Sequence, residues 1–225
     1  MGLALVALQR GYRMIFVVPD KFAGEKVAVL KAYGAEVVIT ETSVPPEDPR
    51  SYYSVSDRLV REIPGAFKPN QFANPNGPLS HYETTGPEIW RDTEGRITHF
   101  VSSMGTTGTI MGCSRFFKEK NPKIQIIGCE PSEGSQIPGI RKWPEAYLPK
   151  IYDRARVDRV EPVSQAEAEE MTRRLAREEG IFAGISSGGA LHVALRISKE
   201  VKNAVIVTIV CDRGDRYLST GVFPD

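Results

Sequence analysis

Apolar positions along the chain follow two alternating periods, and this alternation predicts an α/β protein. Short β-branched and aromatic runs are typical of buried strands, and the segments between them carry apolar residues at helical spacing. The first part of the chain predicts a helix over 2–10 closed by Gly11, a strand over 14–18, a helix over 24–33 and a strand over 36–40. Strand, helix and strand joined by short links imply a parallel sheet with right-handed crossovers.

The same alternation continues to the end of the chain. A capping box from Ser164 to Glu167 marks the start of a charged helix that ends near Gly180. The other predicted elements are helices over 52–63, 79–92 (which Gly86-Pro87 can kink), 110–118 and 186–200, and strands over 97–101, 123–128, 181–185 and 204–210.

Two segments rich in proline and glycine interrupt this pattern and are predicted to be irregular. Residues 71–78 contain two prolines and a glycine, which do not suit a helix or a central strand. Residues 133–144 form a longer loop without periodicity. Long structureless loops in compact domains tend to be lids or binding loops, so the second segment is a candidate for either.

The first predicted helix has no capping residue. It is apolar and begins at the initiator methionine, with no polar side chain before it to accept from its first amides. We therefore expect that a segment upstream of Met1 is missing.

The composition indicates an ordinary globular protein. The chain has 225 residues, 41% hydrophobic and 25% charged, with a net charge of +1 from 29 basic and 28 acidic residues. Charges of both signs are interspersed, which argues against a nucleic-acid surface. Because no apolar run approaches the ~20 residues of a membrane span and no signal peptide is visible, we expect no membrane association and a cytoplasmic location.

Cysteine and histidine give no sign of a metal site. The cysteines are odd in number and widely spaced in apolar contexts, which is typical of reduced thiols rather than a disulfide framework (Cys113, Cys129 and Cys211). The histidines do not have the spacing of metal ligands, and each is predicted to be structural (His81, His99 and His192).

A glycine- and threonine-rich loop over 102–109 is the strongest candidate for chemistry. It follows a predicted strand and opens a helix, so unpaired backbone amides and the positive end of the helix dipole meet there. Gly105 and Gly108 let the backbone come close to a phosphate, and the hydroxyls of the three threonines can donate to it. The lysine of a P-loop and the dinucleotide glycine spacing are both absent. These residues alone leave the loop open between a phosphate site and an ordinary βα turn.

Four loop segments together resemble the pyridoxal-phosphate enzymes of the cysteine synthase family. They are 71–78, 102–109, 184–190 and 212–220, and they occur in the family's order over nearly the whole chain. The phrases at 99–109, 137–143 and 211–217 resemble the B-type cysteine synthases in particular.

The resemblance implies a fold and a division into domains. The fold is that of the tryptophan synthase β-subunit (fold type II), incomplete at its N-terminus. Residues 1–75 would form most of the smaller α/β domain. Residues 76–225 would form the larger domain that binds pyridoxal phosphate, without its N-terminal strands.

The resemblance also implies roles for named residues. The cup for the cofactor phosphate would comprise Gly105, Thr106, Thr107, Gly108 and Thr109. Ser186 would bond the pyridine nitrogen, although the same residue also suits a helix N-cap. Gln71 would hold the substrate carboxylate, and Arg141 and Trp143 would belong to a lid unless 137–143 is an ordinary surface loop. Cys211 and Asp212 would line the pocket.

The chain departs from the family at its catalytic lysine. The family's Schiff-base lysine lies in a Ser-x-Lys segment upstream of a Ser-Gly-Asn-Thr-Gly loop, and neither motif is present. No lysine of this chain stands in that context (Lys21, Lys26, Lys31, Lys68, Lys118, Lys120, Lys123, Lys142, Lys150, Lys199 and Lys202). Because this lysine anchors the cofactor and moves protons, we expect no catalytic residue in this chain and little activity from the chain alone.

The implied activity is cysteine synthesis from O-acetylserine, or a related activated serine, and sulfide or thiosulfate, in a homodimer. Two alternatives stay open. The chain could be an inactive or complementing fragment that binds the cofactor or phosphate, or it could carry cystathionine β-synthase chemistry, against which the Arg141–Trp143 segment argues by resemblance.

Overall fold

The computed structural model describes residues 1–20 and 24–223, so Lys21 lies outside the described residues. The chain divides into two compact units, Met1–Pro69 and Asn70–Asp225. The division falls a few residues before position 75, where the resemblance places the domain boundary.

The first unit is a small parallel α/β layer. Its elements are α1 (Gly2–Arg10), β1 (Ile15–Pro19), α2 (Gly24–Ala32), β2 (Glu36–Thr40) and α3 (Tyr52–Glu62). Strands β1 and β2 pair in parallel from Ile15↔Glu36 to Pro19↔Thr40, which confirms the predicted strand–helix–strand unit. The predicted stop of α1 is also confirmed, because Gly11 caps it in the left-handed conformation.

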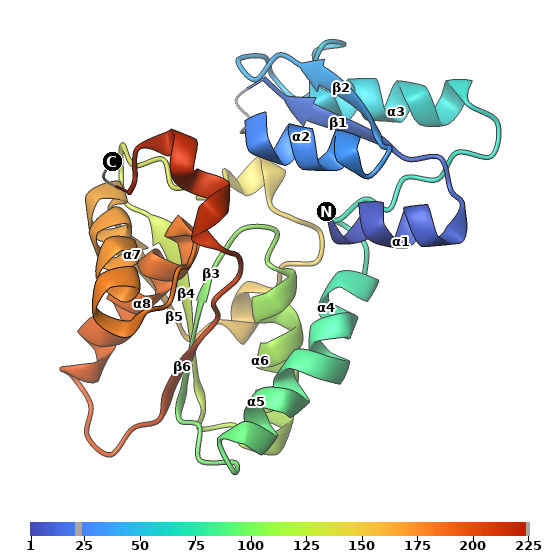
Figure 1. The fold of residues 1–225 in the computed structure, drawn as a ribbon. Coiled ribbons are helices and arrows are strands. Elements are labelled where there is room, and N and C mark those ends of the chain that lie inside the picture. The colour runs from blue at the N-terminus through green and yellow to red at the C-terminus, as the bar shows by residue number, and fades with distance from the viewer. Residues whose placement is uncertain (21–23, 224–225) are drawn as a thin grey trace. The chain divides into compact units, whose positions relative to one another are not determined.

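The second unit is a four-stranded parallel sheet with helices on both faces (Figure 1). Its strands are β3 (His99–Ser103), β4 (Gln125–Pro131), β5 (Arg159–Val163) and β6 (Ile206–Thr208), in the order β5-β4-β3-β6. The helices that cover it are α4 (Asn76–Ser80), α5 (Gly86–Asp92), α6 (Gly108–Lys120), α7 (Gln165–Glu179) and α8 (Ile185–Ser198). The predicted α/β class with parallel sheets is confirmed.

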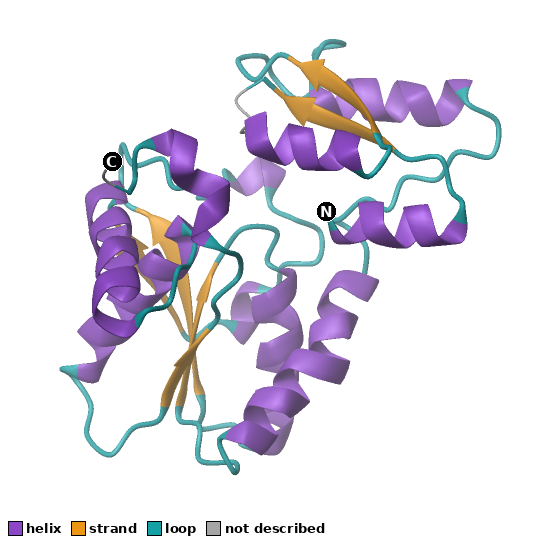
Figure 2. Cartoon of the chain, in the orientation of Figure 1, coloured by secondary structure: helices purple, strands orange, loops and turns teal. Residues whose placement is uncertain are grey.

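Neighbouring residues of β3 supply two separate cores, because side chains alternate across a strand. Phe100 packs with α6, in a cluster that includes Ile110 and Phe117. Val101 packs with α8 on the other face, in a cluster that includes Val193 and Ile197. Figures 1 and 2 show α7 and α8 on one side of this sheet and α5 and α6 on the other. The sheet is buried on both faces, as parallel sheets generally are.

The sequence pattern misplaced several strands. No strand forms over 181–185, since Ile185 already begins α8 and Ala183 makes only an isolated bridge to Arg213. Strand β5 was missed because it contains Pro162 and charged residues. It lies at the sheet edge, where proline is tolerated. Strand β3 extends to Ser103, beyond its apolar run, because β4 supplies partners for its last two residues.

The predicted helix over 79–92 is longer and has three parts. Helix α4 already begins at Asn76, so the expectation of an irregular segment through Pro78 was wrong there. Proline fits the first turn of a helix, whose amides have no intrahelical acceptor. A π-helical turn, η1 (His81–Thr85), separates α4 from α5, and Pro87 stands in the first turn of α5.

The predicted capping box of α7 is present. The Ser164 hydroxyl accepts from the Glu167 amide at 3.2 Å, and the Glu167 carboxylate accepts from the Ser164 amide at 2.8 Å. Helix α7 ends at Gly180 in the left-handed conformation, as predicted.

Within residues 1–20 and 24–223, no helix has the length and apolar character needed to cross a membrane.

Candidate functional site

The loop that opens α6 holds a residue in a strained conformation. Strand β3 ends at Ser103 and α6 begins at Gly108, with Thr107 as the N-cap in the left-handed region at φ 70° and ψ −2°. A β-branched side chain seldom adopts this region. Such strain persists where the surroundings impose it, and it gathers at ligand sites.

The Thr107 side chain also carries an unsatisfied polar atom. Its hydroxyl oxygen is buried and has no hydrogen-bond partner among the described residues, and it does not cap α6. A buried hydroxyl without a partner is destabilising. The amides of the first turn of α6, which follows Thr107 directly, have no acceptor within the helix and carry the positive end of the helix dipole. A small anion such as a phosphate monoester would satisfy both groups.

The two glycines of this loop have different reasons to be glycine. A Cβ on Gly105 would lie 2.8 Å from the carbonyl oxygen of Gly139, so any side chain there would displace a neighbouring loop. A Cβ on Gly108 would make only ordinary contacts, 3.7 Å from the Gly77 carbonyl carbon. The close packing of these two loops is therefore sufficient to explain why residue 105 is glycine.

That neighbouring loop, 137–143, is anchored rather than free. Residues 137–140 have the proline and the glycine, at φ 90°, that a type II turn requires, and Ile137 and Ile140 are buried. The Arg141 amide donates to the Met104 carbonyl at 2.8 Å, and the Trp143 indole donates to the Gly105 carbonyl at 2.8 Å. The sequence-predicted lid segment is thus bonded directly to the loop that opens α6.

The side chains of Arg141 and Trp143 differ in exposure. Arg141 is exposed, and its guanidinium carbon lies 5.1 Å from the centre of the Trp143 ring. Phe72 meets the same indole edge-on at 5.4 Å. This aromatic contact is the link from the loop to Gln71, which precedes Phe72 and is exposed.

Ser186 lies where two of these loops meet. It is the second residue of α8 and Gly184 is the N-cap, so the alternative reading of Ser186 as an N-cap was wrong. Its carbonyl accepts from the Ser103 hydroxyl at 2.7 Å. A Cβ on Gly139 would lie 3.0 Å from the Ser186 Cβ. The end of β3, the 137–143 loop and the start of α8 are therefore in direct contact.

Cys211 and Asp212 approach the same end of α8. The Cys211 amide donates to the Ser187 hydroxyl at 3.1 Å, and the Gly184 amide donates to the Asp212 carbonyl at 2.9 Å. One carboxylate oxygen of Asp212 accepts from the Tyr217 hydroxyl at 2.6 Å. The other is buried without a partner among the described residues. Burial, reinforced by this hydrogen bond to Asp212, raises the pKa of Tyr217, so its hydroxyl stays protonated.

The cysteines are free thiols, and those in the core are unreactive. Burial raises the pKa of Cys113 to about 12 and also raises the pKa of Cys129, so neither forms a thiolate near neutral pH. Cys211 is exposed. No group of three or more His, Cys, Asp or Glu side chains with metal-ligand geometry occurs in the described part of the chain.

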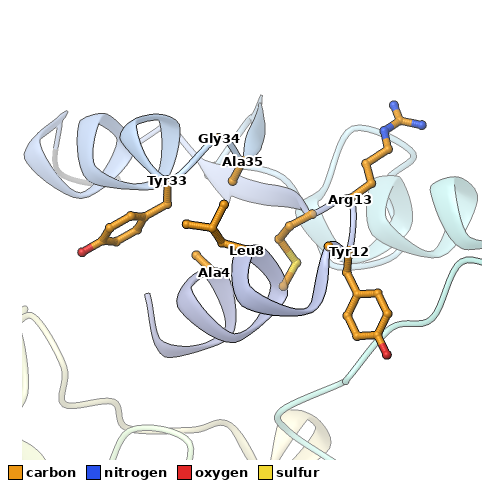
Figure 3. Close-up of a pocket in the computed structure, with 9 residues that line it drawn as sticks. Ala4, Leu8, Tyr12, Arg13, Tyr33, Gly34 and Ala35 are labelled. Atoms are coloured by element: carbon orange, nitrogen blue, oxygen red, sulfur yellow. The ribbon is translucent and has the colours of Figure 1, made fainter.

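A separate hollow of about 400 Å³ lies in the first unit (Figure 3). It is open and mostly apolar, between α1 and the segment that leads into β2. The residues that line it are Ala4, Leu8, Gly11, Tyr12, Arg13, Met14, Tyr33, Gly34 and Ala35. None of the site residues predicted from the sequence is among them.

Comparison with known proteins shows the family of the chain. Residues 1–212 match the model of the pyridoxal-phosphate dependent enzymes, and the chain belongs to that family. It is 57% identical over 222 residues to cysteine synthase B of Pseudomonas aeruginosa, covering 99% of this chain and 73% of the relative. It is 50% identical to cysteine synthase B of Escherichia coli, covering 99% of this chain and 72% of the relative.

Solved structures of related enzymes superpose closely on this chain. Cysteine synthase of Entamoeba histolytica superposes with a TM-score of 0.88 at 32% identity, covering 99% of this chain and 68% of that one. An O-acetylserine dependent cystathionine β-synthase of Helicobacter pylori gives 0.87 at 37% identity, covering 98% and 74%. The predicted fold type II architecture is confirmed.

The residues present fit the phosphate of the family's cofactor. The unpartnered Thr107 hydroxyl and the first-turn amides of α6 offer donors to an anion. When bound, pyridoxal phosphate supplies a conjugated ring that withdraws electrons from the bonds at a substrate's α-carbon.

Replacing Thr107 by glycine is expected to separate stability from binding. Glycine relieves a left-handed strain of about 1–2 kcal/mol, which offsets its own entropic cost of roughly 0.5–1 kcal/mol. It also removes the unpartnered hydroxyl. We expect the free energy of unfolding to stay equal or rise by up to about 1 kcal/mol, while affinity for phosphate falls by about tenfold. Thermal unfolding and phosphate titration measure the two effects, and a less stable variant with unchanged affinity would contradict this account.

Proposed function

We propose that this chain is part of a cysteine synthase of the B type, which joins O-acetylserine or a related activated serine to sulfide or thiosulfate with pyridoxal phosphate as cofactor. The observation that carries the proposal is the unpartnered Thr107 hydroxyl at the start of α6, in a chain so similar to cysteine synthase B. Its substrates are small molecules, and we place it in the cytoplasm as a homodimer.

Each loop that resembles the family then has a task in holding the cofactor and the substrates. The cup residues 105–109 donate to the cofactor phosphate, and the Ser186 hydroxyl bonds the pyridine nitrogen. A neutral hydroxyl at that place leaves the nitrogen unprotonated, which suits elimination and replacement at the β-carbon. In this proposal residues 76–225 form the cofactor-binding domain and residues 1–75 most of the smaller domain.

The loop around Arg141 is suited to the anionic partners of this reaction. Arg141 is exposed on a loop that is bonded to the cup, so its guanidinium is accessible to an acetate leaving group or a thiosulfate. Gln71 holds the substrate carboxylate, next to Phe72 and its contact with Trp143. Cys211 and Asp212 line the pocket beside α8.

The chain by itself lacks the family's catalytic lysine, because no lysine stands in the Ser-x-Lys context. That lysine bonds the cofactor and carries protons in catalysis. We propose that residues 1–225 bind the cofactor phosphate but form no cysteine unaided.

A second candidate function, a fragment that works with a separate lysine-bearing segment, is favoured by the edge of the sheet. Strand β6 lies at this edge, and no described strand pairs with its outer side. The hydroxyl of Thr208 in β6 is buried without a partner among the described residues. Unpaired edges accept further strands. Cystathionine synthesis has less support, since the two relatives reported above with the highest identity are cysteine synthases.

The test is an assay of the purified chain with pyridoxal phosphate, O-acetylserine and sulfide. We expect saturable cofactor binding, measured by the fluorescence of the bound cofactor, and no cysteine above the rate without protein. Cysteine formed at a rate typical of the family would contradict the second expectation. Absence of cofactor binding by the purified chain would contradict the first.

A further inference from the structure

A rare helical turn brings a histidine against the cup. The π-helical turn η1 spans His81–Thr85, and such turns are frequent at functional sites. It packs closely on α6, where a Cβ on Gly112 would lie 2.7 Å from the His81 Cβ and 2.1 Å from the Pro78 carbonyl oxygen. Glycine at 112 is therefore what allows this close approach.

The His81 ring is held at both nitrogens. Nδ1 lies 2.9 Å from the Thr85 hydroxyl, within the π turn. Nε2 lies 3.2 Å from the hydroxyl of Thr109, in the first turn of α6. The ring is half-buried, so it has one defined orientation between a structural turn and a cup residue.

The direction of these two hydrogen bonds decides what Thr109 can do. Burial lowers the pKa of His81, so at neutral pH the ring carries one N–H only. A threonine hydroxyl has a single hydrogen to donate. If Nε2 accepts from Thr109, that hydrogen is used within the protein. If Nε2 donates to Thr109, the hydrogen is directed to a ligand.

We propose that His81 is a positioning residue for the cup, holding Thr109 so that its hydroxyl donates to the cofactor phosphate. Thr85 donates to Nδ1, which places the ring proton on Nε2, and Nε2 donates to Thr109. The threonine keeps its hydrogen for the phosphate. The inference rests on the proposed function, since it needs a phosphate at the cup.

The test is a titration of the full chain with inorganic phosphate, followed by ³¹P NMR, for single and double variants. His81→Asn removes the donor at Nε2, and its phosphate affinity is expected to fall by about tenfold. In His81→Gln the longer side chain brings an amide N–H to the place of Nε2, so affinity is retained. Thr109→Val keeps the shape and loses the hydroxyl. In that background His81→Asn is expected to have no further effect, because His81 acts through Thr109.

Four results would overturn the inference. An unchanged affinity in His81→Asn rejects the role of His81 and leaves the phosphate cup standing. The same holds if His81→Asn lowers affinity as much in the Thr109→Val background as in the natural chain. Equal losses in His81→Asn and His81→Gln with matching drops in melting temperature indicate a purely structural role. Failure of the natural chain to bind phosphate rejects this inference together with the phosphate cup of the proposed function.

Discussion

A chain with alanine in place of Gly188 is expected to unfold at a clearly lower temperature than the natural chain. Gly188 lies in the first turns of α8, where it faces α7. A Cβ there would stand 2.1 Å from the Thr172 hydroxyl and 2.4 Å from the Ala168 carbonyl. These atoms are fixed, because the buried Thr172 hydroxyl donates to that carbonyl at 2.7 Å. The two helices would have to move apart.

The expected loss is about 2–3 kcal/mol, typical of overpacking in a core. For a unit of this size it corresponds to a fall in Tm of roughly 5–10 °C. Helix propensity acts in the opposite direction, because alanine in place of glycine stabilises a helix interior by about 1 kcal/mol. A net loss of stability would therefore come from the contact with α7. Calorimetry or a circular-dichroism melt measures it.

Gly189→Ala is the matched control. It is the next residue of the same helix, but its Cβ would meet only side-chain atoms, the nearest being the Ile140 methyl at 2.9 Å. That end of a flexible side chain can rotate away. We expect Gly189→Ala to stay within about 1 kcal/mol of the natural chain. Equal losses of stability in both variants would show that this part of α8 tolerates no added methyl group. The contact with α7 would then not explain the effect of Gly188→Ala.

The sequence predicted the parts of the fold in which local signals agree with packing. The left-handed glycines at 11 and 180 and the capping box at Ser164 act within one turn of the chain, so no tertiary knowledge is needed. Strand β2 was also predicted with its bounds, because its apolar run is closed on both sides by polar residues.

The sequence could not predict features that depend on distant partners. The two serines that end β3 have no strand propensity, and they pair only because β4 continues beside them. The segment over 181–185 has a strand-like composition, but in the fold Ala183 makes only an isolated bridge to Arg213, and Ile185 already begins α8. Pattern reasoning has no access to that contact.

The site was accessible from the sequence only through resemblance. Nothing in the residues 102–109 alone separated a phosphate loop from a βα turn, whereas the structure adds a strained Thr107 with a buried, unpartnered hydroxyl. His81 was read as structural because the histidines lack the spacing of metal ligands, and its contacts with Thr85 and Thr109 depend on the π turn and on the packing of η1 against α6. The His81 and Thr85 spacing of four residues was the one available signal.

Addition of a lysine-bearing segment is expected to turn the chain from inactive to active. The segment is a peptide or co-expressed fragment with the family's Ser-x-Lys and Ser-Gly-Asn-Thr-Gly motifs, both absent from residues 1–225. Its strands would pair with the free edge of β6, and its lysine would supply the missing covalent anchor. Without the lysine, loss of covalent catalysis commonly lowers rates by several orders of magnitude, so we expect a gain of at least about 10³-fold on mixing.

Two controls separate pairing from chemistry. The same segment with alanine in place of its lysine should bind the chain, as measured by comigration in gel filtration, and leave cysteine formation at background. A variant of the chain with proline in place of Thr208 removes a backbone donor on the outer side of β6, because the parallel register with β3 turns the amides of Val205 and Val207 toward β3, and it should weaken the association itself. If the lysine-bearing segment comigrates with the chain and no cysteine forms, residues 1–225 lack more than a lysine. If it does not bind, the free edge of β6 is not where the rest of the enzyme pairs.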